Sequence, residues 1–133
     1  MLAGYLFLTA SIIAVTLILI IFKRSMENLK QFPGNRGTMQ MYFFLGAALA
    51  EIIPIFIILF GLMKIKPSPL STFIVPGIGI LLAIIFAIIH VFSQTKNVNE
   101  DIKKDVVSFA FIGITLTLAL PVVSLLTLLL FIE

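Results

Sequence analysis

The chain has 133 residues, of which 61% are hydrophobic and only 11% are charged. A water-soluble domain of this size needs more polar surface than this composition supplies, so the composition excludes an ordinary soluble enzyme and indicates a membrane protein. The formal net charge is +3, and the chain contains no cysteine, which excludes a disulfide framework and a thiolate metal site.

The chain contains four apolar segments, at about 2–22, 41–63, 70–92 and 106–132. Each has roughly 20 residues or more, which is enough for a helix to cross a hydrocarbon core about 30 Å thick. The first segment lacks the basic leading region of a signal peptide and is too long for one, so we interpret it as a retained helix. The sequence therefore predicts an all-α membrane protein with four transmembrane helices.

Basic residues gather in two of the three connections, after the first segment and after the third. These residues are Lys23, Arg24, Lys30, Arg36, Lys96, Lys103 and Lys104. The connection between the second and third segments holds only two lysines. Because Lys and Arg near the ends of spans mark the cytoplasmic side, we expect both basic loops in the cytoplasm and both termini on the opposite side.

The two halves of the chain resemble each other. A shift of 67 positions places FLGAALAEIIP (44–54) over FIGITLTLALP (111–121), so the pattern F-x-G-x-x-L-x-x-x-x-P occurs twice. A chance match between two apolar helices is the alternative, but a proline at the same place in both speaks for duplication. We therefore predict two tandem antiparallel hairpins, 1–67 and 68–133, of which only the first has an acid in the repeated pattern.

That acid, Glu51, lies near the middle of the second apolar segment. An ionised carboxylate at the bilayer centre costs about 3 kcal/mol on insertion scales, so such residues usually face a partner or a water-filled path. Desolvation favours the neutral acid, and a group that is neutral in lipid but charged beside water or an arginine can carry a proton. The alternative is a structural acid that hydrogen-bonds a neighbouring helix and never ionises.

The residues next to Glu51 in the sequence favour a close helix contact. Ala47, Ala48 and Ala50 leave little side-chain bulk, so another helix can approach the backbone. Pro54 has no N–H group, so the carbonyl of Ala50 loses its helical hydrogen bond and lies free near the carboxyl group. We expect these four residues to form the surroundings of the proton-binding site.

The same residues resemble the proteolipid c subunit of rotary ATP synthases and ATPases. The second helix of that family has a motif like G-x-A-L-x-E-A-x-P around the ion-binding carboxylate, and GAALAEIIP matches it closely, including the proline three residues after the acid. A fused double hairpin is similar to the V-type c subunits, in which one hairpin commonly lacks its carboxylate. In those chains the acid is usually in the later hairpin, whereas Glu51 is in the earlier one.

The loop after the first segment, RSMENLKQFPGNRG, is also similar to the polar loop of the family, which has the general form R-Q-P. The resemblance implies that this loop contacts the central stalk. The candidate stalk-contact residues are Arg24, Glu27, Lys30, Gln31, Pro33 and Arg36. Gln31 stands where the family has its loop arginine, and Lys30 is adjacent to it.

The choice of ion follows from the oxygen atoms near the acid. Sodium-binding members of the family place a hydroxyl residue after the glutamate and a glutamine on the facing helix, because a bare cation needs several oxygen ligands. Here Ile52 follows Glu51, and counting back from the loop proline makes Ile18 the facing residue. Thr16 lies half a turn away, where its hydroxyl can bond its own backbone. We therefore predict protons rather than sodium, without a cofactor or metal.

The resemblance implies a homo-oligomeric ring of this chain in an energy-coupling plasma or inner membrane, in contact with lipid and with no nucleic-acid partner. The ring would turn against a stator a subunit with an arginine, carry protons on Glu51, and drive ATP synthesis or hydrolysis through central-stalk subunits. The chain itself would not be catalytic. Two alternatives remain open: a small four-helix proton-coupled transporter that works as a dimer, and a diverged structural paralogue of the c subunit.

Overall fold

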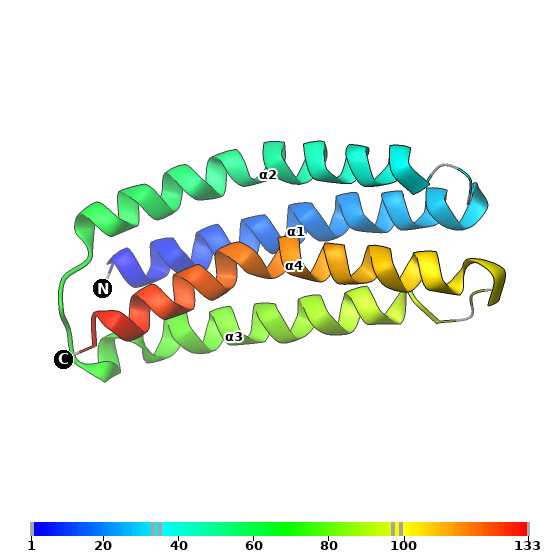
Figure 1. The fold of residues 1–133 in the computed structure, drawn as a ribbon. Coiled ribbons are helices and arrows are strands. Elements are labelled where there is room, and N and C mark those ends of the chain that lie inside the picture. The colour runs from blue at the N-terminus through cyan, green and yellow to red at the C-terminus, as the bar shows by residue number, and fades with distance from the viewer. Residues whose placement is uncertain (1, 33, 35, 97, 99, 133) are drawn as a thin grey trace.

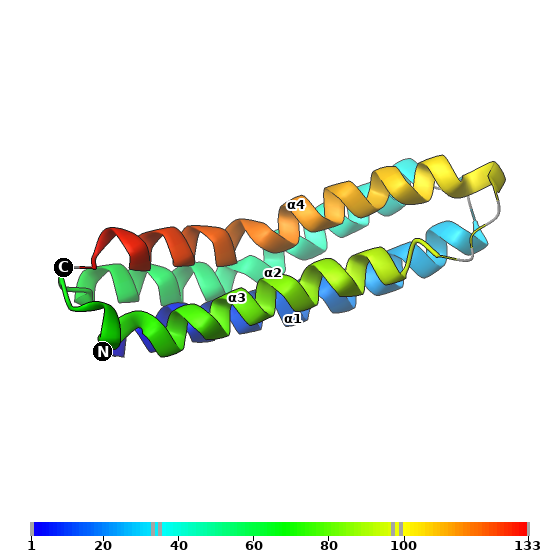
Figure 2. The ribbon, with the colours of Figure 1, turned by 90° about the horizontal axis from the view of Figure 1, so that it is seen from below.

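The structure is a computed structural model that describes residues 2–32, 34, 36–96, 98 and 100–132. The described chain forms four α-helices, α1 (Leu2–Gln31), α2 (Arg36–Lys64), α3 (Leu70–Ser93) and α4 (Glu100–Leu130). They lie side by side in one elongated bundle, and the chain reverses direction at each connection (Figure 1 and Figure 2). All four are long and apolar enough to cross a membrane, which confirms the prediction of an all-α chain with four such helices.

Three helices, α1, α2 and α4, are several residues longer than the apolar segments that predicted them. α1 continues through the predicted first loop to Gln31, and α4 already begins at Glu100. The apolar stripe of α1 continues with it, since Phe22, Met26 and Leu29 recur at helical spacing and are fully buried. Packing of these side chains keeps the polar end of α1 helical, so most of the residues that were expected to form the loop after the first segment belong to α1.

α1 is the central helix of the bundle. It packs against α2, α3 and α4, whereas α2 meets α4 only narrowly, and α2 and α3 are the outermost helices in Figure 1. One cluster of buried apolar side chains surrounds Phe22 near the basic end, where α1 and α3 finish and α2 and α4 begin. A second cluster surrounds Phe7 near the opposite end. Both clusters contain residues from 1–67 and from 68–133, so the two halves share their core.

Three aromatic rings from three helices meet inside the first cluster. Phe22 of α1 stacks on Phe109 of α4 with ring centroids 5.3 Å apart, and Phe43 of α2 lies 5.6 Å from Phe22 and 5.5 Å from Phe109. All three side chains are fully buried. A Cβ atom at Gly113 would overlap the ring of Phe22, so α4 needs glycine there to let this ring in.

The opposite end of the bundle is fastened by backbone contacts. The amide of Ser68, between α2 and α3, donates to the carbonyl of Phe131 at 3.0 Å, and Ser68 forms a parallel bridge with Ile132. The chain that follows α4 is thereby held beside the α2–α3 connection. Because this hydrogen bond joins positions on either side of α3 and α4, it closes the second half of the bundle at that end.

Large apolar side chains cover the outward faces of the two outermost helices. Among the described residues, examples on α2 are Leu49 and Phe56, and examples on α3 are Leu82 and Phe86, all more than half exposed. A soluble monomer rarely shows such a continuous apolar surface. These faces suit contact with lipid or with other membrane helices.

We predict that Gly113→Ala destabilises the bundle by about 1–3 kcal/mol, because the added methyl group overlaps Phe22 and overpacks the aromatic cluster. Gly77→Ala is the matched control, since it also lies inside a helix and the nearest neighbour of its added Cβ is a Leu125 methyl group 4.0 Å away. Thermal unfolding in detergent, followed by the helical circular dichroism, compares the two variants. Equal stability of both would contradict this role of Gly113.

Candidate functional site

Glu51 lies on the inward face of α2. Phe43, Ala47, Pro54 and Ile58 are buried at spacings of four and seven residues, one and two helical turns, and form the stripe that α2 turns toward the rest of the bundle. Glu51 falls in this stripe and is half-buried. One of its carboxyl oxygens, Oε1, is fully buried and has no hydrogen-bond partner among the described residues.

Packing contacts show which part of α1 stands beside Glu51. Gly46 of α2 lies directly against Ile21 of α1, where an added Cβ would come within 3.0 Å of the isoleucine. Because the two helices are antiparallel, five residues forward from Gly46 correspond to five residues back from Ile21. This register sets Glu51 level with Thr16, in the half of the apolar part of α1 that lies nearer the basic end.

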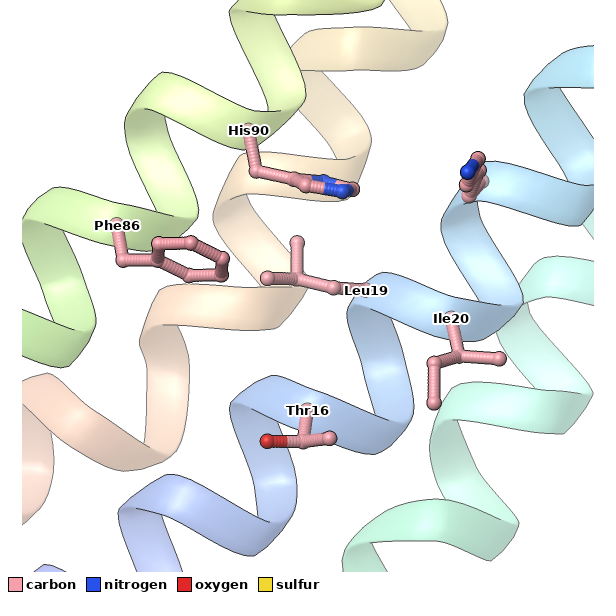
Figure 3. A pocket seen from close by; sticks show the side chains of 6 residues that line it. Thr16, Leu19, Ile20, Phe86 and His90 are labelled. Atoms are coloured by element: carbon pink, nitrogen blue, oxygen red, sulfur yellow. The ribbon is translucent and has the colours of Figure 1, made fainter.

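The two candidate neighbours on α1 have different surroundings. Thr16 is level with Glu51, but its side chain is exposed on the α3 side of α1, where it lines a pocket with Phe86 and His90 (Figure 3). Ile18 lies half a turn nearer the basic end and is fully buried in the apolar cluster that contains Ala47. Neither residue therefore brings an oxygen atom to the carboxyl group.

The repeat partner of Glu51 lies at the same depth on α4. Gly113 packs against Phe22, so five residues along α4 the chain reaches Leu118, level with the part of α1 that stands beside Glu51. Leu118 packs against the first apolar cluster and is half-buried. The two copies of the repeated pattern thus set a carboxyl group and an isobutyl group at one level of the bundle.

The small residues around Glu51 divide between the two faces of α2. Ala47 is buried, Ala50 is half-buried, and Pro54 turns its ring into the bundle, while Ala48 is exposed on the outer surface. Pro54 lies inside α2, so its missing N–H leaves the Ala50 carbonyl without its usual helical donor. One helix turn therefore supplies a free carbonyl and two methyl groups beside the acid.

Among the described residues, four buried hydroxyl residues were not predicted to form part of a site: Ser11, Ser25, Thr117 and Ser124. Thr117 of α4 is fully buried and donates to the Gly113 carbonyl at 2.6 Å, while the hydroxyls of Ser11 and Ser124 are buried without a partner among the described residues. The signal was present in the sequence, since Ser11, Thr117 and Ser124 each interrupt an apolar run, with a threonine two or three residues away. Such residues often bond their own helix, which is why they attracted no functional interpretation.

The candidate stalk-contact residues lie mainly on the last two turns of α1 rather than in a loop. Arg24, Glu27 and Gln31 are exposed and Lys30 is half-buried. They stand well apart from Glu51, toward the basic end. Arg36 begins α2, but its side chain and the whole of Pro33 lie outside the described residues.

The arrangement around Glu51 suits proton exchange better than metal binding or a structural role. In the part of the chain that the structure describes, no three His, Cys, Asp or Glu side chains gather to hold a metal ion. A buried oxygen without a hydrogen bond costs about 1–3 kcal/mol, a cost that a purely structural acid would avoid by finding a partner. Because Oε1 has no hydrogen-bond partner among the described residues, it can take up and release a proton without breaking a hydrogen bond there.

We predict that Glu51→Leu raises the free energy of unfolding by about 1–3 kcal/mol, because it removes a buried oxygen that has no partner. Glu51→Gln is the matched control and should give no such gain, since the amide leaves polar atoms in the same place. Unfolding of the protein in detergent by heat or by sodium dodecyl sulfate measures both. A loss of stability in Glu51→Leu would instead favour the structural acid.

No family model matches the chain, and no curated protein or solved structure shows significant similarity to it. The likeness to c subunits therefore depends on the motif around Glu51 and on the polar residues that follow the first span.

Proposed function

We propose that this chain is a rotor-ring (c) subunit of a rotary ATP synthase or ATPase and carries protons across the membrane on Glu51. The observation that carries the proposal is a buried carboxyl oxygen without a hydrogen-bond partner, in the middle of a helix long enough to span a membrane. An acid held in this way is energetically unfavourable, so it is usually present because its change of charge has a function. The GAALAEIIP motif supports the assignment to this family.

The proton would be exchanged by movement of the carboxyl group between the two faces of α2. A helical side chain leans over the turn that precedes it, so Glu51 lies over Ala47 and Ala48. Ala47 is buried and Ala48 is exposed. Because both carry only a methyl group, the carboxyl can swing from the bundle, where it is protonated, to the outer surface, where a stator arginine would favour the carboxylate.

A proton is the proposed ion because the surroundings of Glu51 offer few other oxygen atoms. Thr16 points into a pocket on the far side of α1, Ile18 is buried in an apolar cluster, and Ile52 is exposed on the outer face of α2. Sodium needs several oxygen ligands, whereas a proton needs only the carboxyl group itself. Together these placements favour proton transfer.

The ring would be built from fused hairpins, α1 with α2 and α3 with α4. The broad apolar faces of α2 and α3 supply the surface that neighbouring copies and lipid would cover. Each chain has one membrane-embedded acid, Glu51, for its four helices. A ring of these chains would therefore move half as many protons per turn as an unfused ring of equal circumference. Such a ratio suits proton pumping better than synthesis at low driving force.

One observation favours the second candidate, a small proton-coupled transporter. Glu51 lies on the inward face of α2, toward the core that both halves of the chain share, rather than on the outer surface. A carboxyl group inside a single bundle could couple proton movement to a substrate without any ring. The functional unit would then be a dimer, and Glu51→Gln would abolish substrate efflux without affecting an ATPase.

We predict that dicyclohexylcarbodiimide labels Glu51 in membranes, since this reagent attacks a protonated carboxyl in an apolar site, and that Glu51→Gln removes both the labelling and the proton flux. Glu100→Gln is the matched control, because Glu100 is exposed at the polar start of α4 and has no part in the proposed site. Mass spectrometry of the labelled protein and proton uptake into vesicles measure the two effects. Unchanged proton flux in Glu51→Gln would contradict proton carriage and favour the structural paralogue.

We further predict a closed ring of many copies in gently solubilised membranes, because the exposed faces of α2 and α3 need apolar partners. Native electrophoresis followed by electron microscopy of the purified complex counts the helices directly. A dimer in this measurement would overturn the rotor-ring proposal and leave the transporter.

A further inference from the structure

A groove runs along the outside of the bundle between α1 and α3, on the far side of α1 from Glu51. It consists of two pockets that share Thr16 and Phe86 and are therefore continuous. The pocket nearer the basic end is also lined by Lys23 and His90. Figure 3 shows His90 above this pocket. The deeper pocket has no charged residue in its lining and includes Gly79 and Ala83.

The length of this groove matches one leaflet of a bilayer. Lys23 directly follows the first apolar segment, and His90 lies in the last turn of α3, so both stand where the hydrocarbon ends. Gly79 lies eleven residues earlier on α3, which is about 16 Å along a helix with a rise of about 1.5 Å per residue. Half of a hydrocarbon core about 30 Å thick is about 15 Å.

The mouth of the groove combines a positive charge with a directed hydrogen-bond donor. The side-chain amide nitrogen of Gln94 lies 3.0 Å from Nδ1 of His90. This contact occupies Nδ1, so Nε2 is the ring nitrogen that remains for a ligand, and it carries the hydrogen in the tautomer whose Nδ1 accepts from the Gln94 amide. Figure 3 shows the His90 ring extending from α3 toward α1, over the pocket that Lys23 also lines.

We propose that this groove binds a phospholipid with an anionic head group. The phosphate lies between the Lys23 ammonium and the Nε2–H group of His90, and one acyl chain follows the groove past Phe86 to Gly79 and Ala83. The occupant is argued from charge complementarity, since the groove is basic only where a lipid head group lies and apolar along the depth of its chain. Basic pockets between membrane helices commonly bind such head groups.

This binding is independent of the proposed proton carriage. The groove lies between α1 and α3, whereas Glu51 is on α2, and no residue of the groove lines the inward stripe of α2. A chain that does not carry protons could still bind the lipid, and a rotor subunit could carry protons without a lipid in this groove.

Native mass spectrometry of the purified chain, titrated with phosphatidylglycerol and with phosphatidylcholine of the same chain length, tests the proposal. We expect phosphatidylglycerol to bind at least fivefold more tightly, since each Lys near a membrane surface contributes about 1 kcal/mol toward anionic lipid. Lys23→Gln should remove about this fivefold preference, and His90→Phe, which keeps a ring but removes the donor, should weaken binding about twofold or more. Arg24→Gln is the matched control, because Arg24 is adjacent in sequence but lines a different pocket, between α1 and α2.

Two further measurements separate the lipid from other occupants. Ala83→Leu fills the deeper pocket and should weaken the binding of both lipids. Glycerol phosphate, which has an anionic phosphate without an acyl chain, should bind far more weakly than phosphatidylglycerol. Equal binding of the two lipids, unchanged binding in Lys23→Gln, or equal binding of glycerol phosphate would overturn the proposal. A second copy of the chain retained in place of lipid would also overturn it, and the lipid preference of the unsubstituted protein decides the question even where a variant does not fold.

Discussion

Hydrocarbon offers no hydrogen-bond partner, so every polar group that this chain takes into the membrane must find one within the protein or remain at a cost. The backbone meets this requirement with four long helices. Thr117 meets it by bonding a carbonyl of its own helix. Glu51 does not, because one of its oxygens is buried without a partner among the described residues. The hydroxyls of Ser11 and Ser124 are also buried without a partner among the described residues, but only the carboxyl group of Glu51 can change its charge by taking up or releasing a proton. The proposed function depends on this property of Glu51.

The number and the type of the helices could be predicted from the sequence, because length and apolar content alone decide whether a segment can span a bilayer. The ends of the helices could not. Hydropathy predicts that the first span ends at Lys23. The helix itself continues as long as its side chains can pack against other parts of the protein. Met26 and Leu29 find one in the shared core, so α1 extends to Gln31 and takes most of the expected loop with it.

The acid of the candidate site could be predicted from the sequence, but the residues that surround it in space could be predicted less well. A lone glutamate in an apolar segment is visible in any hydropathy plot, and so are the small residues beside it. Which residue of α1 stands beside Glu51 depends on how two helices pack, here on the contact of Gly46 with Ile21. Counting back from the loop proline, which predicted Ile18 as the facing residue, takes no account of that contact. The face on which a side chain lies, as for Thr16 and Ile18, depends in turn on where α3 is, which no local pattern in α1 specifies.

The central place of α1 has a consequence for how the protein is made. Of the four helices α1 leaves the ribosome first, yet each surface that it finally buries is supplied by a helix made later. In lipid this order carries little risk, because hydrocarbon solvates apolar side chains such as Phe7 and Phe22 about as well as a neighbouring helix does. The bundle can therefore grow outward from its axis during synthesis, with each new helix displacing lipid from α1.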